Sequence, residues 1–190
     1  ITTALTVPVS HLIIRNHIGE NLGWDSAGYW QGIWYISSMY LMIVTTSLGV
    51  YYLPKLSEIQ DNSELKKEIF NGYKIIMPIV IVMSIFIFLL KEYIILIAFS
   101  DKFMPMMELF AWQLIGDVIK ITSWLLAYLM LAKAMTKIFI YTEIGFSVLF
   151  VLLSIDFIDT FGLVGITYAF SLNYFLYLVV MIFIFRKRFR

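Results

Sequence analysis

Long runs of residues without formal charge dominate this sequence and limit what it can fold into. Between Trp30 and Leu53 no side chain carries a formal charge, and a helix of about 20 apolar residues crosses a bilayer core about 30 Å thick. Hydrophobic residues make up 61% of the 190-residue chain and charged residues 14%, with a mean hydropathy of +0.87. Soluble domains have roughly 45–50% apolar and about 25% charged residues. The sequence therefore predicts an integral membrane protein.

Polar stretches divide the chain into six apolar segments, which predicts an all-α polytopic membrane protein with about six transmembrane helices. The expected spans are residues 1–14, 30–53, 73–90, 109–131, 138–155 and 164–185. The first segment is too short to cross a bilayer alone, and the sequence lacks both an initiator Met and the pattern of a signal peptide. We therefore expect residues 1–190 to be a fragment whose first helix is truncated.

The polar stretches predict three kinds of connection. Residues 15–25 are expected to form a loop, and residues 93–99 are too short to cross and are expected at the interface. Residues 55–74 are the most polar stretch, in which Asp61 and Glu64 have the spacing of a capping box. This stretch predicts either a short helix along the membrane surface or a solvated connector.

The positive charges predict how the chain lies in the membrane. If the six spans alternate in direction, ten of the 14 Lys and Arg residues fall in loops on one side, three fall on the other, and Lys120 lies within a span. The ten are Lys55, Lys66, Lys67, Lys74, Lys133, Lys137, Arg186, Lys187, Arg188 and Arg190. Short loops rich in Lys and Arg remain in the cytoplasm. We therefore expect a cytoplasmic C-terminus.

The span 109–131 carries the polar residues that most favour a functional site. At 100° per residue, Gln113, Asp117, Lys120 and Trp124 lie within about 60° of one another on the helix, and Asp117 and Lys120 have the spacing of an ion pair. One interpretation is a structural ion pair or a polar stripe packed against other helices. The other is that this face lines a water-filled cavity, in which Lys120 meets an anionic substrate at a lower desolvation cost.

Polar residues in the other spans favour structural roles. Glu143, Ser147 and Ser154 share a face of the span 138–155, but Glu143 lies close to Lys137, which favours an acid that reaches to the interface. The face from Trp34 to Tyr52 carries small and hydroxyl residues, which favours helix packing.

Nothing in the sequence indicates an enzyme. Cys is absent, His occurs only at His11 and His17, and no motif of a nucleophile, a phosphate loop or a metal site is present. We therefore expect no cofactor and no metal, and the net charge of +1 gives no indication of nucleic-acid binding.

Three stretches together resemble a known family. They are GWDSAGYWQ at residues 23–31, YYLPKLS at residues 51–57 and QLIGDVIK at residues 113–120. In this order and spacing they resemble the Wzx-type flippases of Gram-negative bacteria, especially the O-antigen and lipid III (enterobacterial common antigen) flippases. These flippases belong to the multidrug/oligosaccharidyl-lipid/polysaccharide exporter superfamily. The resemblance covers essentially the whole chain, as the C-terminal lobe of a transporter of about twelve helices.

This resemblance implies a transporter and not an enzyme. Its members move undecaprenyl-pyrophosphate-linked oligosaccharides across the bacterial inner membrane by alternating access of two lobes. Lys120 and Arg15 match the cationic lumen, and Asp117 either holds Lys120 in place or titrates if protons drive transport. Gln113 and Trp124 complete the candidate substrate-binding set. The implied partners are the lipid-linked substrate, the bilayer, the missing N-terminal lobe, a polysaccharide polymerase and a chain-length regulator.

Three alternatives are weighed against the flippase. A multidrug or cation antiporter of the same superfamily should carry unpaired carboxylates in its core, whereas Asp117 has Lys120 beside it. A polytopic membrane enzyme of polysaccharide assembly needs catalytic His, Asp or Arg residues in large loops outside the membrane. The longest expected loop, residues 55–74, faces the cytoplasm, which counts against such an enzyme. A membrane scaffold without a transport role is disfavoured only mildly, by the polar face of span 109–131.

Overall fold

A computed structural model describes the backbone of residues 2–188 and the side chains of residues 5–186, and no strand occurs in this part of the chain. The long helices are α1 (Thr2–Leu22), α2 (Trp24–Ser47), α4 (Asn62–Leu89), α6 (Phe110–Ala132), α7 (Thr136–Phe161) and α8 (Gly165–Arg188). The shorter elements are the π-helix η1 (Leu48–Tyr52), α3 (Leu53–Glu58), α5 (Lys91–Ala98) and the 3₁₀ segments η2 (Asp101–Leu109) and η3 (Gly162–Val164). The predicted all-α class is confirmed.

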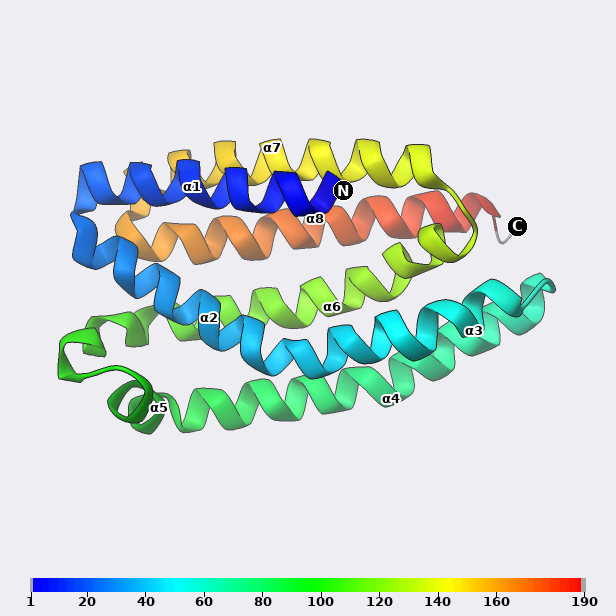
Figure 1. The fold of residues 1–190 in the computed structure, drawn as a ribbon, viewed down its shortest axis with the longest axis horizontal. Coiled ribbons are helices and arrows are strands. Elements are labelled where there is room, and N and C mark those ends of the chain that lie inside the picture. Colours follow the sequence, from blue (N-terminus) through cyan, green and yellow to red (C-terminus); the bar gives the residue numbers. More distant parts are fainter. Residues whose placement is uncertain (1, 189–190) are drawn as a thin grey trace.

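Four helical stretches of the described residues are long and apolar enough to cross a membrane: Trp24–Glu58, Asn62–Leu89, Asp101–Ala132 and Thr136–Arg186. The last stretch contains α7, η3 and α8, and Figure 1 shows α7 and α8 as two antiparallel helices side by side. α1 is not among the four, because its second half carries polar side chains such as Arg15 and Glu20. The chain is a multi-pass membrane protein.

Helix α6 is the centre of the helix bundle. It packs against α8 on one side and against α4 on the other, while α7 packs against both α8 and α1 (Figure 1). Gly116 brings α6 and α8 close together, because a Cβ atom there would lie 2.4 Å from Cδ1 of Phe170. Small residues at such crossings let membrane helices approach closely.

Several predicted boundaries are wrong, because polar residues continue helices instead of ending them. Residues 15–25 do not form a loop: α1 runs to Leu22, and Gly23 makes the turn with a φ of 89°. Residues 55–74 form neither one short surface helix nor one long connector: they end α3, make a short connection at residues 59–61 and begin the unbroken helix α4. The capping residue is correct, because Asp61 accepts a 2.8 Å hydrogen bond from the Glu64 amide. Polar side chains can face the headgroups while the backbone keeps its helical hydrogen bonds.

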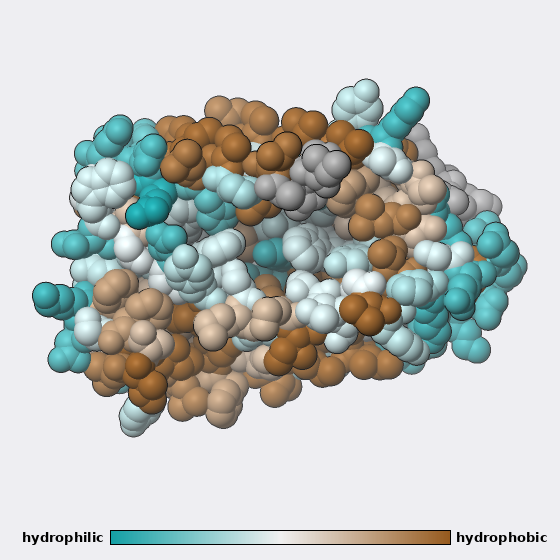
Figure 2. Space-filling view, viewed as in Figure 1, coloured by the Kyte–Doolittle hydropathy of each residue, from teal (hydrophilic) through white to brown (hydrophobic). Residues whose placement is uncertain are grey.

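The connections gather at the two ends of the bundle, as the alternating spans require. The α3–α4 connection, the α6–α7 turn and the C-terminal end of α8 lie at one end, and the α1–α2, α5–η2 and α7–α8 connections lie at the other (Figure 1). Figure 2 shows hydrophilic residues at both ends, hydrophobic residues along the sides, and a hollow between α1 and the α2–α3 segment. Of the residues used for the sequence predictions, Ile1 and Arg190 and the side chains of Lys187 and Arg188 lie outside the described part.

Candidate functional site

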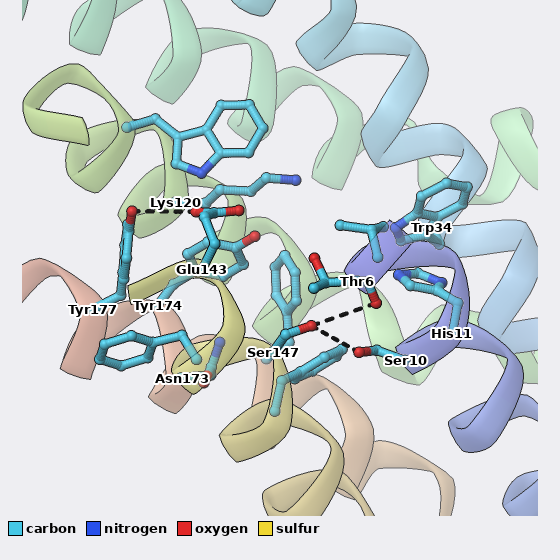
Figure 3. Close-up of a pocket in the computed structure, with 15 residues that line it drawn as sticks. Thr6, Ser10, His11, Trp34, Lys120, Glu143, Ser147, Asn173, Tyr174 and Tyr177 are labelled. Atoms are coloured by element: carbon cyan, nitrogen blue, oxygen red, sulfur yellow. Dashed lines mark hydrogen bonds between the residues drawn. The ribbon is translucent and has the colours of Figure 1, made fainter. Parts of the chain in front are cut away.

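A polar cavity of about 250 Å³ lies inside the bundle, where α1, α2, α6, α7 and α8 converge (Figure 3). Polar and aromatic side chains from each of these helices line it, including Ser10, His11, Trp34, Lys120, Trp124, Glu143, Ser147, Asn173, Tyr174 and Tyr177. The cavity therefore has polar and aromatic walls, and five helices contribute to them.

Lys120 is the cation of this cavity, and it lies against aromatic rings. Its Nζ atom is 4.9 Å from the ring centroid of Trp124, 5.6 Å from that of Tyr174 and 5.8 Å from that of Phe170. Among the described residues, no carboxylate forms an ion pair with it. Ring faces stabilise an ammonium group but do not use its three hydrogen-bond donors. Lys120 can therefore bind an anion in the cavity.

The opposite wall presents hydrogen-bonding groups of α7 and α8. Tyr177 donates to Oε1 of Glu143 at 3.4 Å, and Figure 3 shows both side chains facing the same space as Lys120. Asn173 is only 5% exposed, and its Oδ1 atom has no hydrogen-bond partner among the described atoms. Buried polar atoms are usually satisfied, so this acceptor indicates a place for a water molecule or a ligand donor.

Helix α1 closes the cavity on its other side. Ser10 and Ser147 share a 2.8 Å hydrogen bond that joins α1 to α7. His11 stacks on Trp30 at 5.0 Å and meets the edge of Trp34 at 4.6 Å. These contacts fix the Trp34 ring and the His11 imidazole at the cavity wall, with Trp30 behind them.

Asp117 lies outside the cavity, in a separate polar cluster between α2, α4 and α6. Its Oδ2 atom accepts hydrogen bonds from Ser37 at 2.6 Å and from Tyr40 at 2.9 Å, and its Oδ1 atom accepts one from Gln113 at 3.4 Å. Tyr40 also shares a 3.2 Å hydrogen bond with Ser84 of α4. Asp117 is fully buried, so the cluster replaces the water that a carboxyl group would otherwise need.

The structure divides the five residues predicted for the site. Lys120 and Trp124 line the cavity, whereas Asp117 faces α2 and Gln113 bonds to Asp117. The ion pair expected between Asp117 and Lys120 is not formed, because Asp117 is bound by the hydroxyls of α2 instead. Arg15 is exposed on α1 and is not among the residues that line the cavity. The predicted polar face of α6 therefore contributes residues to two neighbouring places, the cavity and the Asp117 cluster.

Sequence reasoning missed the contributions of α7 and α8. Glu143 was expected to reach to the interface, but it lines the cavity. Asn173 is a polar residue in an apolar part of α8. A polar side chain within a membrane span indicates a possible site, and this signal could have identified Asn173. No cluster of His, Asp or Glu in the described part of the chain could hold a metal ion.

A bundle of long apolar helices around a cavity with polar and aromatic walls places the chain in the class of polytopic membrane proteins with an internal cavity. The chain belongs to the family described as lipid II flippase MurJ, whose model matches residues 5–190. Two curated proteins named Lipid III flippase, from Escherichia coli (strain K12) and Shigella flexneri, are each 34% identical over 175 residues, which is 92% of this chain. The chain spans 42% of the length of these relatives. No solved structure matches it.

The resemblance noted in the sequence is confirmed at the level of lipid-linked flippases of the exporter superfamily. The finer expectation of a Wzx-type flippase for O-antigen or for lipid III (enterobacterial common antigen) stays a prediction.

Proposed function

We propose that this chain is the C-terminal lobe of a flippase that moves an undecaprenyl-pyrophosphate-linked oligosaccharide to the periplasmic leaflet of the bacterial inner membrane by alternating access. The observation that carries the proposal is Lys120, a cavity-lining ammonium group that forms no ion pair with a carboxylate among the described residues. The relatives are named as flippases, which agrees with the prediction that the chain is not an enzyme.

The position of Lys120 favours an anionic substrate. A lysine at the centre of a membrane helix costs about 2.5–3.5 kcal/mol on insertion scales, and a carboxylate partner would offset part of this cost. Here three aromatic rings contact the ammonium group, and the carboxylates of Asp117 and Glu143 lie farther from it than an ion pair. A pyrophosphate that enters the cavity would bring negative charge into direct contact with Lys120 and accept hydrogen bonds from Nζ.

The remaining walls favour a sugar next to the phosphate. The Asn173 Oδ1 atom and the Glu143 carboxylate can accept hydrogen bonds from sugar hydroxyls, and the rings of Trp34 and Tyr174 offer apolar faces against which a sugar ring can lie. An O-antigen unit and an enterobacterial common antigen unit both have this chemistry, and we propose either as the cargo.

The size of the cavity favours a site shared between two lobes. Its volume of about 250 Å³ is below the roughly 300–1,000 Å³ of pockets that enclose a drug-sized ligand, and an oligosaccharide is larger still. We therefore propose that the N-terminal lobe completes the site. A polysaccharide polymerase and a chain-length regulator remain proposed partners downstream.

A cation antiporter is the second candidate, and Glu143 is the observation that favours it. A carboxylate in the cavity wall can attract a cationic drug as well as a sugar hydroxyl. The two candidates differ in the residue on which they depend: Lys120 for an anionic lipid and Glu143 for a cation.

Complementation tests the proposal. The full-length protein that contains this chain would be expressed in bacteria that lack their own flippase for O-antigen or for enterobacterial common antigen, and surface polysaccharide would be measured. We expect restoration in at least one background. Because a charge-assisted hydrogen bond contributes about 1.5–3 kcal/mol, Lys120→Ala should reduce transport by roughly tenfold or more.

Lys91→Ala is the matched control. Lys91 also lies over an aromatic ring, that of Phe88 at 4.4 Å, but it is not among the residues that line the cavity. At equal protein levels this variant should restore polysaccharide as well as the parent does. Resistance to cationic drugs that is lost in Glu143→Gln, without restoration in either background, would instead favour the antiporter.

A further inference from the structure

A second cleft, of about 460 Å³, opens on the side of the bundle between the α2–η1–α3 segment and α4. Its apolar walls are formed by side chains such as Ile43, Ile75 and Ile79, which are 64%, 65% and 49% exposed. Its polar end is formed by Lys55, Glu68, Asn71 and Lys74. The cleft is thus apolar along most of its walls and charged at one end.

The depth of this cleft in the membrane follows from the charges of its helix. No formally charged residue lies between Lys74 and Lys91, and at 1.5 Å per residue these lysines are about 25 Å apart. This distance is close to the hydrocarbon thickness of about 30 Å. Lys74 therefore lies at the level of the headgroups, and Ile75 and Ile79 lie at the level of the adjoining acyl chains.

The charged end is arranged to favour an anion. Lys55 of α3 reaches across to Glu68 of α4 at 2.7 Å, which neutralises that carboxylate. Lys74 is exposed and lies 4.7 Å from the ring centroid of Phe70, with no carboxylate partner among the described residues. One positive charge thus remains at the mouth, beside the amide of Asn71.

A buried hydroxyl without a partner adds an independent sign of a ligand. Tyr52 lines the cleft and is 3% exposed, and its OH atom has no hydrogen-bond partner among the described atoms. Its ring lies on Gly72, where a Cβ atom would be only 2.9 Å from Tyr52 Cε2. The glycine therefore lets the tyrosine sit deep in the wall, where its hydroxyl can donate to a ligand or to a water bound with it.

We propose that this cleft binds a phospholipid with an anionic headgroup. Its phosphate lies at Lys74 and beside the Lys55–Glu68 pair, and an acyl chain lies along Ile75 and Ile79. A lipid fits because the cleft opens to the bilayer at headgroup depth, and an anionic one fits because the unpaired charge there is positive. This site is separate from the Lys120 cavity, so it does not depend on the proposed cargo.

Native mass spectrometry of the full-length protein tests the proposal, with phosphatidylglycerol and phosphatidylcholine of identical acyl chains as probes. We expect the protein to retain phosphatidylglycerol at least several-fold more strongly, and Lys74→Gln to remove most of this preference. Lys91→Gln is the matched control, since Lys91 also lies over a phenylalanine but at the other end of the apolar stretch. It should keep the preference.

A second pair of variants tests the apolar part of the cleft. Ile79→Trp should fill it and weaken phosphatidylglycerol binding, whereas Ile85→Trp, at an exposed position of α4 that does not line the cleft, should not. Three results would overturn the proposal: equal binding of the two lipids, equal losses in Lys74→Gln and Lys91→Gln, or displacement of phosphatidylglycerol by equimolar undecaprenyl phosphate. The last result would assign the cleft to the tail of the substrate.

Discussion

Asp117 shows how this bundle keeps a carboxyl group inside the membrane without an ion pair. Two hydroxyls of α2, from Ser37 and Tyr40, donate to the same oxygen, and Ser84 extends the cluster to α4. Because Tyr40 gives its proton to Asp117, the Ser84 hydroxyl is the donor in their shared bond. The cluster therefore connects three helices through one residue of α6.

The first prediction concerns this cluster. Asp117→Ala would leave the buried hydroxyls of Ser37 and Tyr40 without their acceptor, and each unsatisfied group costs about 1–3 kcal/mol. We expect a clearly lower midpoint of thermal unfolding for the full-length protein in detergent. Ser26→Ala is the control, because the Ser26 hydroxyl bonds to Leu22 O at an exposed position. An unchanged midpoint in Asp117→Ala would show that water replaces the carboxylate at no cost.

The same residues show what a sequence can predict about a site of this kind. Lys120 and Trp124 could be placed together because they share one helix, and the geometry of one helix is known in advance. Glu143 and Asn173 reach the cavity from α7 and α8. Their meeting with Lys120 depends on how three helices rotate against one another, and the periodicity of a single helix contains no information on that rotation.

At the scale of elements, α6 and α8 are held together by a close approach at Gly116. A methyl group there would collide with Phe170 at 2.4 Å and with the Ser171 hydroxyl at 2.9 Å. Phe170 is itself one of the rings around Lys120. The packing of these two helices therefore positions part of the cavity wall.

The second prediction compares two glycines. Gly116→Ala should destabilise the protein by about 1–3 kcal/mol through overpacking, and should also lower transport because Phe170 must shift. Gly145→Ala should be neutral or slightly stabilising, since no atom lies within 4 Å of a Cβ at this position of α7 and alanine favours a helix by up to about 1 kcal/mol. Thermal unfolding and complementation would measure both effects. Equal behaviour of the two variants would contradict the close contact.

Helices were easier to predict than their ends, for a physical reason. Hydropathy reports which residues lie in hydrocarbon, whereas a helix continues for as long as its backbone hydrogen bonds can form. Arg15, Lys66 and Asp156 all lie outside the predicted spans but inside helices. Gly23 and Gly162, with φ angles of 89° and 67°, mark the turns between α1 and α2 and between α7 and α8.

At the scale of the whole molecule, the two ends of the bundle differ in charge. Ten of the 14 basic residues belong to the three segments expected on one side of the membrane. These segments include the α3–α4 connection and the α6–α7 turn, which lie at the same end of the bundle (Figure 1). The positive-inside rule makes this the cytoplasmic end, which we propose as the orientation. Lys74 and the phospholipid cleft then face the cytoplasmic leaflet, where anionic lipids give the surface a negative potential.

The third prediction tests this orientation with cysteines introduced into the full-length protein after any native cysteine outside this chain has been replaced. The chain itself contains none, so each new thiol reports on one position. Gln60→Cys lies in the exposed α3–α4 connection. Glu20→Cys lies in the last turn of helix α1, where it is exposed at the other end of the bundle. In intact spheroplasts a membrane-impermeant maleimide should label Glu20→Cys at once, and should label Gln60→Cys only after permeabilisation. The reverse pattern would place the C-terminus in the periplasm and move the phospholipid cleft to the outer leaflet of the inner membrane. Labelling of both positions in intact spheroplasts would mean that the two positions lie on the same side of the bilayer. This result would contradict the structure, which places the α1–α2 and α3–α4 connections at opposite ends of the bundle.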